Sequence, residues 1–484
     1  MTQSRPEQAA LACGVLIASV LLVAPNFDVF AGLSYYDTKR LLQIALYGCL
    51  MLVLLASRSL RAEWLASFEL LPPLARWALG LVLVFGVLSA VLSHSGSIRL
   101  TYSLAEVALF AAIAGSALLV ATIMRVHGGT AQRTLLVVIV ASVGLYLFRF
   151  LTRYAVALGT GDPVFVDALF GNFSHIRFIA QWLSWTLPLV VVVAAFSTRR
   201  SLRWLSYVTA ALWWLLLLVS GTRATMLAIT VALVLVPLLA GRPGLKWLQL
   251  QLVSAAAGMA CYLLGFRAVA TLHSGTGLGR LATGHTSGRF AMWSEAWQMI
   301  KADPVPGGGP QSYAFVIDHT GSHPHNAALQ WAAEWGLPSL VIMTLLVTLA
   351  VIRWLQFVRR EYGSDDGHTG LLAAGLTGSV LTAAGHSMLS GIIVMPLSQL
   401  YLAIIAGWML FLYQQRQQPV RQWSLQRHIA LMLCAMLASL SLLHVALRDV
   451  SVLPQITSAY EDEYGILRPR FWQHGRAPVY PPRP

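Results

Sequence analysis

One stretch of the sequence combines residue types that could move a proton. Residues 321–338 read Gly-Ser-His-Pro-His-Asn-Ala-Ala-Leu-Gln-Trp-Ala-Ala-Glu-Trp-Gly-Leu-Pro. The residues from Asn326 onward fit a helix that enters a membrane, which places His325 just before that helix at headgroup level. A neutral imidazole, with an ordinary pKa of about 6.5, can accept a proton from a hydroxyl group near neutral pH. The alternative is that His325 only caps the helix, and His323 is a second candidate for the base.

Three arginines occupy positions that suit an anionic ligand. Arg223 lies at a predicted helix end, Arg289 lies in a long loop, and Arg177 lies where another loop becomes a helix. The planar guanidinium group matches phosphate oxygens and keeps its charge. The alternative for Arg223 is a side chain that extends to the membrane interface, and for Arg177 a role in topology. The loops predicted to face outward contain no convincing Asp-x-Asp pair, so no bound divalent metal is expected.

Other residues of these segments allow more than one interpretation. His386 lies near the end of an apolar run, where an ionisable residue is a functional candidate, although it could simply pack against Ser387. Glu334 could orient a partner or end the amphipathic segment, and we expect no catalytic role for it. Trp293 and Trp297 are four residues apart on one helical face, so they could stack on a sugar or pack the loop onto the bundle.

The composition places these residues in a membrane protein. Of 484 residues, 57% are hydrophobic and 11% are charged, against roughly 25% charged in soluble domains. A soluble enzyme could not cover so much apolar surface. The net charge is +14, and all basic residues except Lys39, Lys246 and Lys301 are arginine. Because the arginines are scattered, the charge does not indicate nucleic-acid binding. The four cysteines lie in apolar runs, which predicts buried, reduced side chains.

Apolar runs of about the length that crosses a bilayer recur along the chain. The sequence therefore predicts an all-α, polytopic bundle of about 12–13 transmembrane helices. No convincing cleavage site follows the first run, so we expect it to be retained. The thirteen runs are 9–25, 41–57, 74–93, 104–124, 134–151, 178–197, 203–220, 223–240, 247–265, 337–353, 371–390, 396–413 and 429–447.

The short loops predict the orientation of the bundle, because Lys and Arg favour the cytoplasmic side. With the N-terminus inside, the inner loops hold 16 basic residues and the short outer loops hold 6. The loops 152–177 and 266–325 then face outward, which in a bacterial inner membrane means the periplasm. We expect one transmembrane domain over residues 1–447. The remainder, 448–484, is polar and then Pro-rich (Pro478, Pro481, Pro482 and Pro484), which predicts an extended periplasmic tail.

Several motifs resemble the O-antigen ligase and polymerase superfamily of bacterial membrane glycosyltransferases. The pattern His325-Asn326, Leu329-Gln330, Glu334 and Gly336 is similar to the signature of that superfamily. The resemblance covers roughly residues 170–410. It extends to Gly288-Arg289 with Trp293 and Trp297, to the Gly307-Gly308-Gly309 turn, and to Ser220-Gly221-Thr222-Arg223-Ala224.

The resemblance implies an activity and a partial division of roles. Superfamily members move a glycan en bloc from undecaprenyl diphosphate to a hydroxyl acceptor. By analogy, His325 is the preferred base because the pattern places a histidine directly before asparagine. Arg223, Arg289 and Arg177 would hold the diphosphate in place of a metal, with His323, Asn326, Glu334 and His386 in support. Direct displacement by the acceptor oxygen would invert the anomeric carbon, and no cofactor is expected.

The acceptor is left open by the sequence. Lipid A–core is the first choice, as in the O-antigen ligases of lipopolysaccharide biosynthesis, followed by a pilin or other protein hydroxyl, and then by a growing O-antigen. A lipid or polysaccharide transporter is the alternative from a different class. A transporter usually has two related halves with matched broken helices, and the sequence contains no such internal symmetry.

Overall fold

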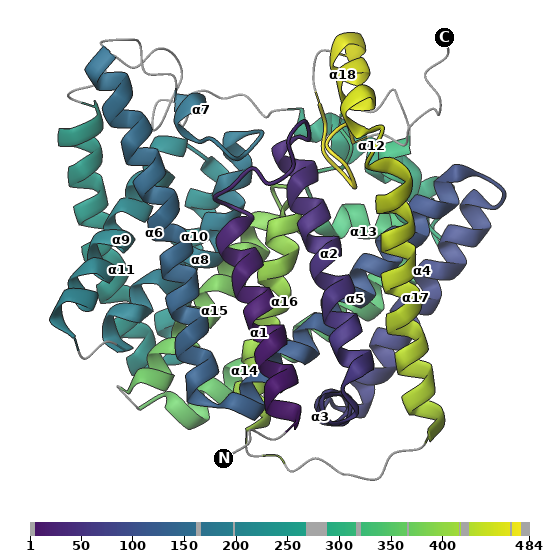
Figure 1. Ribbon diagram of the computed structural model, residues 1–484, viewed down its shortest axis with the longest axis horizontal. Coiled ribbons are helices and arrows are strands. Elements are labelled where there is room, and N and C mark those ends of the chain that lie inside the picture. The colour runs from purple at the N-terminus through teal and green to yellow at the C-terminus, as the bar shows by residue number, and fades with distance from the viewer. Residues whose placement is uncertain are drawn as a thin grey trace.

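The protein is a helical bundle, as the computed structural model in Figure 1 shows. The structure describes residues 5–475 apart from 161–165, 197–198, 268–287, 316–320, 365–366, 416, 418–424 and 465–466, and these described residues form no strand. The helices are α1 (Arg5–Val23), α2 (Tyr35–Ala56), α3 (Arg58–Glu69), α4 (Pro73–His94), α5 (Ile98–His127), α6 (Gly129–Thr160), α7 (Val166–Leu169), α8 (Ile176–Phe196), α9 (Arg200–Ser220), α10 (Arg223–Ala240), α11 (Arg242–Ala260), α12 (Arg289–Ala302), α13 (Ala327–Trp335), α14 (Leu337–Tyr362), α15 (His368–Ser387), α16 (Pro396–Gln414), α17 (Leu425–Asp449) and α18 (Leu453–Tyr464). Shorter helical turns are η1 (Cys261–Arg267), η3 (Ser312–Phe315) and η4 (Ile392–Val394).

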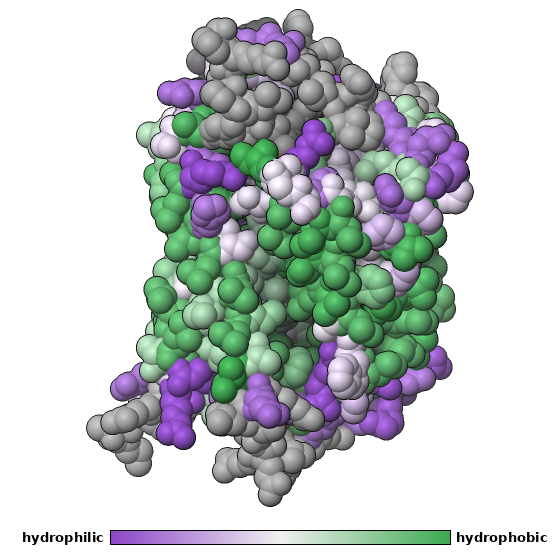
Figure 2. Space-filling view, turned by 90° about the vertical axis from the view of Figure 1, so that its right-hand side faces the viewer, coloured by the Kyte–Doolittle hydropathy of each residue, from purple (hydrophilic) through white to green (hydrophobic). Residues whose placement is uncertain are grey.

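Among the described residues, 12 helices are long and apolar enough to cross a membrane. Their outward side chains include Trp77, Leu92 and Leu264, which are 75%, 71% and 74% exposed. Such side chains form a broad hydrophobic belt with hydrophilic residues above and below it (Figure 2). The belt is the surface expected of a bundle surrounded by hydrocarbon, so the prediction of a multi-pass membrane protein is confirmed.

The predicted span 371–390 is the one that has no counterpart among these 12 helices, and its composition differs from theirs. It corresponds to α15, a 20-residue helix rich in Gly, Ala, Ser and Thr. Small residues let helix backbones approach each other closely. A Cβ atom added at Gly378 would lie 2.8 Å from the Trp247 ring of α11, and one added at Gly385 would lie 3.3 Å from Cβ of Ala228 in α10. Because α15 packs against α8, α10 and α11, it is an interior helix.

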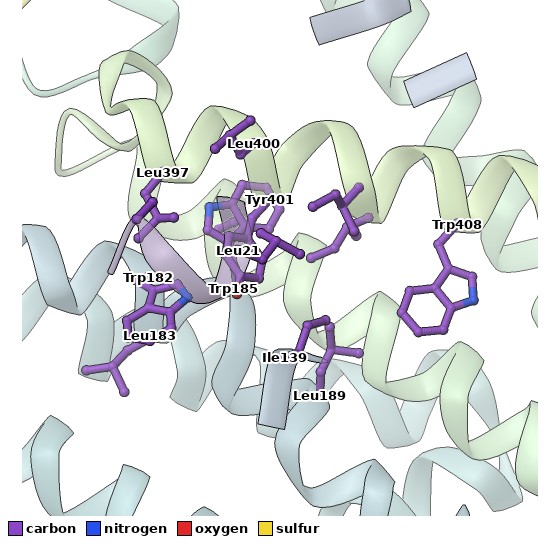
Figure 3. Close-up of a cluster of buried hydrophobic side chains, with 14 of the residues drawn as sticks. Leu21, Ile139, Trp182, Leu183, Trp185, Leu189, Leu397, Leu400, Tyr401 and Trp408 are labelled. Carbon is purple, nitrogen blue, oxygen red and sulfur yellow. The ribbon is translucent and has the colours of Figure 1, made fainter. Parts of the chain in front are cut away.

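The helices form two groups that share a common core. α8, α9, α10, α11 and α15 pack together on one side, and α1, α2, α4, α5, α16 and α17 pack together on the other. Large side chains fill the region between them, including Trp182 and Trp185 of α8, Tyr401 and Trp408 of α16, and Leu21 of α1 (Figure 3). α12 and α18 lie at one end of the bundle, and α1 begins at the opposite end (Figure 1).

Two features differ from the sequence-based expectations. The region after α17 is not simply an extended tail, because it forms α18 and then a segment whose residues 470–475 are buried. The Pro-rich residues Pro478, Pro481, Pro482 and Pro484 lie outside the described residues. The prediction of buried cysteines is wrong for Cys49, Cys261 and Cys434, which are free and exposed, and only Cys13 is buried.

Candidate active site

The three candidate arginines lie in the first turns of three helices. Arg223 is the first residue of α10, Arg289 is the first of α12, and Arg177 is the second of α8. A helix N-terminus carries a positive partial charge, so it favours an anion and disfavours a cation. None of these three first turns contains an acidic residue. Fixed positive charge is therefore added where the backbone is already positive, as expected for an anion-binding site.

Glycines position two of these helix starts. Gly221 ends α9 in the left-handed conformation at φ 58°, and the chain then enters α10 through Thr222. Gly288 has φ 71° directly before Arg289. A left-handed residue reverses the chain direction sharply, and glycine adopts it without a steric penalty. These turns bring the arginines to helix ends rather than to helix surfaces.

The three arginines converge although they are distant in the sequence. Burial lowers the pKa of Arg289, and the nearby charges of Arg177 and Arg223 lower it further. Like charges in a partly buried region repel each other more strongly than they do in bulk water. A bound anion would relieve this repulsion, and a diphosphate carries enough charge to do so.

His325 lies beside this cluster in a strained backbone conformation. Its φ is 55°, a value that residues other than glycine rarely adopt. The neighbouring residues hold it there: the Trp293 indole donates to the Pro324 carbonyl at 3.0 Å, and the Asn326 amide donates to the Met388 carbonyl at 3.3 Å. Asn326 also caps α13 by accepting from the Leu329 N–H at 3.0 Å. Strained residues of this kind concentrate at functional sites.

The electrostatic surroundings keep His325 neutral. Burial lowers its pKa to about 3, with further contributions from Arg177, Arg289 and His175. The imidazole therefore keeps an unprotonated nitrogen across the physiological pH range, as a general base requires. His175 is exposed, and its Nδ1 accepts from the Arg177 N–H at 3.0 Å. The structure thus brings Arg177, Arg289 and His325 together, with Arg223 next to Arg289.

His323 is packed more tightly than His325. Its ring lies 4.2 Å from the His325 ring, and its Nδ1 accepts from the His325 N–H at 3.4 Å. A Cβ atom added at Gly391 would lie 2.2 Å from Cε1 of His323, so the ring is wedged against that glycine. His323 is 5% exposed, and burial lowers its pKa well below the ordinary value. These contacts suit a residue that supports the loop.

His386 of α15 links this helix to α8 and α10. Its Nδ1 lies 2.7 Å from Oγ of Ser184 in α8 and 3.4 Å from Oγ1 of Thr225 in α10. Arg289 and His325 are close enough to interact with it electrostatically. These contacts favour a link from His386 to α8 and α10 over packing against Ser387, because the Ser387 hydroxyl donates to the Ala384 carbonyl instead.

Glu334 is an anchor inside the protein and is fully buried. One carboxylate oxygen accepts from the Tyr313 N–H at 3.3 Å, and the other accepts from Arg470 at 2.5 Å. Burial raises the pKa of Glu334, and the Arg470 charge opposes the rise. Arg470 was missed by the sequence analysis, because it belongs to the segment expected to be a tail. The adjacent aromatic residues Phe471 and Trp472 were the available signal that this segment packs onto the bundle.

Other parts of the structure bear on what the site could hold. An apolar groove of about 530 Å³ lies between α4, α14 and α16 and is lined by residues such as Trp77, Leu345 and Met409. The groove does not include Arg177, Arg223, Arg289 or His325. Its mostly apolar walls suit a hydrocarbon chain rather than a reacting group. Over the described ranges, no group of three or more His, Cys, Asp or Glu side chains could hold a metal ion. Trp293 reaches the His325 loop, whereas Trp297 is 54% exposed.

Comparison with known proteins identifies a family that is similar to part of the chain. A search among curated proteins gives no match. Residues 208–344 match the model of a family described as O-Antigen ligase. The matched region extends from α9 into α14 and includes Arg223, Arg289, His323, His325 and Glu334, while Arg177 and His386 lie outside it. The chain is therefore a multi-pass membrane protein in which residues 208–344 are similar to the O-antigen ligase family.

Proposed function

We propose that the protein moves a glycan en bloc from undecaprenyl diphosphate to a hydroxyl group of lipid A–core, on the periplasmic side of the bacterial inner membrane. The observation that carries the proposal is the convergence of Arg177, Arg223 and Arg289, each in the first turn of a helix, next to the neutral His325. The family match supports a glycan-transferring enzyme with a lipid-linked substrate.

In the proposed reaction, the acceptor oxygen displaces the diphosphate directly. His325 takes the proton of the acceptor hydroxyl as its oxygen bonds to the anomeric carbon. The bond between that carbon and the diphosphate oxygen breaks, and the electron pair leaves with the undecaprenyl diphosphate. The arginines and the helix N-termini stabilise the charge of the leaving group. The proton held by His325 passes to solvent or to the departing diphosphate.

Binding of the donor would also prepare the base. The cationic neighbours Arg177 and Arg289 help to hold the pKa of His325 at about 3. A diphosphate placed between them would offset their charges, so the pKa of His325 would rise toward its ordinary value. The imidazole would then become a stronger base only in the complex that contains the donor. A single displacement inverts the configuration at the anomeric carbon, so a product with retained configuration would contradict this scheme.

The test is a transfer assay with purified protein, lipid-linked glycan and no ion gradient or ATP. Lipid A–core and a pilin are offered as acceptors in parallel reactions, and a third reaction contains the donor alone. Transfer to lipid A–core is the expected result. Transfer to the pilin would identify a protein O-oligosaccharyltransferase, and longer glycans from the donor alone would identify a polymerase. Movement of the donor across a vesicle membrane without bond transfer would identify a transporter and overturn the proposal.

A further inference from the structure

Residues 467–475, here called the C-terminal strap, lie inside the bundle although they follow its last long helix. Arg470, Phe471 and Trp472 are 1%, 2% and 1% exposed. The strap forms no regular secondary structure, apart from a turn in which the Arg470 N–H donates to the Trp472 carbonyl at 3.0 Å. A segment this polar is buried only where other groups satisfy its hydrogen bonds.

Side chains from α2 and α17 supply most of these partners. The Asp37 carboxylate accepts from the Gln473 N–H at 2.7 Å, and the Asp449 carboxylate accepts from the Trp472 indole at 2.8 Å. The Phe471 carbonyl accepts a hydrogen bond from the Arg40 guanidinium at 3.1 Å. The Arg470 carbonyl accepts one from the Tyr36 hydroxyl. Both helices therefore hold the strap through hydrogen bonds to its backbone and side chains.

Arg470 extends from the strap to a helix of the candidate active site. Its Nη2 donates to Glu334 of α13 at 2.5 Å and to Glu106 of α5 at 3.2 Å. Gln330 also belongs to α13. With its side-chain amide turned so that the oxygen faces Arg470, that oxygen accepts from Nη2 of Arg470 at 3.0 Å. Removing one member of a buried ion pair is strongly destabilising, because the other charge is left uncompensated. Arg470 therefore holds α13 firmly.

The strap also contacts the loop that leads into α13. A Cβ atom added at Gly475, whose φ is 74°, would lie 2.6 Å from Oγ of Ser322. The charge of Arg470 is close enough to His323 to act on it electrostatically. His325 and the N-terminal turn of α13 lie between this loop and the α13 residues Gln330 and Glu334 that Arg470 holds. The strap thus contacts both ends of the segment 322–335, and His325 lies inside it.

We propose that Arg470 is a positioning residue for His325 and that the C-terminal strap is an integral part of the active site. Through Glu334 and Gln330, Arg470 sets the placement of α13, and through its contact with Ser322 the strap supports the loop that holds His325. The proposal rests on the proposed function, because it assigns His325 a role in transfer. Preorganised supports of this kind matter because a displacement of about 1 Å at a reacting group can reduce the rate on the order of 100-fold.

The experiment compares four single variants of the full-length protein. Arg470→Met removes the buried cation, and Arg470→Lys keeps its charge but loses the planar fork. Glu106→Gln is the control within the network, because it leaves the Arg470–Glu334 pair in place. Arg76→Met is the control for loss of an ion pair, since Arg76 pairs with Glu69 at the end of α3 and belongs to neither α13 nor the strap.

Two readouts separate positioning from general stability. Hydrogen exchange followed by mass spectrometry measures protection of the α13 amides without any substrate. Steady-state kinetics with the lipid-linked glycan give kcat and KM at a temperature where each variant is fully folded by its own thermal unfolding curve. For Arg470→Met we expect at least tenfold faster exchange in α13 and at least a tenfold lower kcat, with KM changed less than threefold. Arg470→Lys should fall between Arg470→Met and the wild type, and both controls should match the wild type.

The outcomes distinguish this inference from the proposed function. Unchanged α13 exchange in Arg470→Met, or an equal loss of kcat in Glu106→Gln, would overturn the positioning role. If Arg470→Met does not fold, Arg470→Lys replaces it. Faster α13 exchange and a lower kcat in Arg470→Lys than in Glu106→Gln would support the positioning role, and equal values in the two variants would overturn it. Faster α13 exchange with no glycan transfer by the wild type to any acceptor would contradict the proposed function while supporting the contact between the strap and α13. Normal transfer by a His325→Asn variant would remove the role of His325, and with it the positioning proposal.

Discussion

Replacing Arg177 and Arg289 together with glutamine is expected to raise the pKa of His325. A nearby cation disfavours the imidazolium form, so its removal favours protonation. In the wild type, burial is the largest of four causes that bring this pKa from 6.5 to about 3, followed by Arg177 and Arg289. Removing the two arginines removes the second and third largest of these causes, so the pKa of His325 should rise part of the way toward its ordinary value. Each unit of rise is a tenfold change in the protonation equilibrium.

Diethyl pyrocarbonate provides the assay, because it acylates only the neutral imidazole. The labelling rate of the peptide that contains His325 is measured by mass spectrometry between pH 4 and pH 8, without substrate. After correction with N-acetylhistidine amide for the reagent's own pH dependence, the wild-type rate should stay constant over this range. In the Arg177→Gln/Arg289→Gln variant, the corrected rate should begin to fall at a higher pH than in the wild type.

A control with the same loss of charge tests the specificity of the effect. Arg200→Gln/Arg203→Gln removes two exposed arginines from the start of α9, at the end of that helix remote from Arg223. This variant should behave like the wild type. A wild-type midpoint near 6.5, or an identical midpoint in the wild type and the Arg177/Arg289 variant, would refute the claim that burial and the arginine cluster keep His325 neutral.

Three further predictions concern the same site. His325→Asn, chosen because asparagine tolerates a positive φ, should reduce transfer about 10²–10⁴-fold while the protein remains folded, and His323→Asn should reduce it less; the reverse order would identify His323 as the base. Gly391→Ala places a Cβ 2.2 Å from the His323 ring and should lower stability by about 1–3 kcal/mol, measured by thermal unfolding, whereas Gly48→Ala, with nothing within 4 Å of the added Cβ, should be neutral. Transfer should be unchanged by excess EDTA, and a tenfold loss that Mg²⁺ or Mn²⁺ restores would contradict the assignment of the diphosphate to arginines alone.

The helices were predictable because a membrane helix satisfies its own backbone. Every N–H and C=O group in hydrocarbon must be bonded within the segment, so an apolar run of sufficient length indicates a helix by itself. The run 371–390 shows what hydropathy alone does not reveal about a helix. The corresponding helix α15 is rich in small residues that matter through packing against α10 and α11, and packing is invisible in a hydropathy pattern.

The candidate site was predictable as a set of residues but not as an arrangement. Arg177, Arg223 and Arg289 could be chosen one by one for their chemistry, yet their convergence depends on how α8, α10 and α12 meet at one end of the bundle. The position of Arg470 was beyond reach for a related reason. The strap around it is irregular and is held by residues more than a hundred positions earlier, such as Glu334, which accepts from Arg470, and Asp37, which accepts from the Gln473 N–H.

The burial of the C-terminal strap has a consequence for how the protein is made. The strap leaves the ribosome after every helix that it contacts, so Glu334 and Glu106 are made before Arg470. Until Arg470 docks, both carboxylates lack its positive charge, and a buried carboxylate without a counter-charge costs free energy. The packing around α13 is therefore completed only after the strap has been made and has docked.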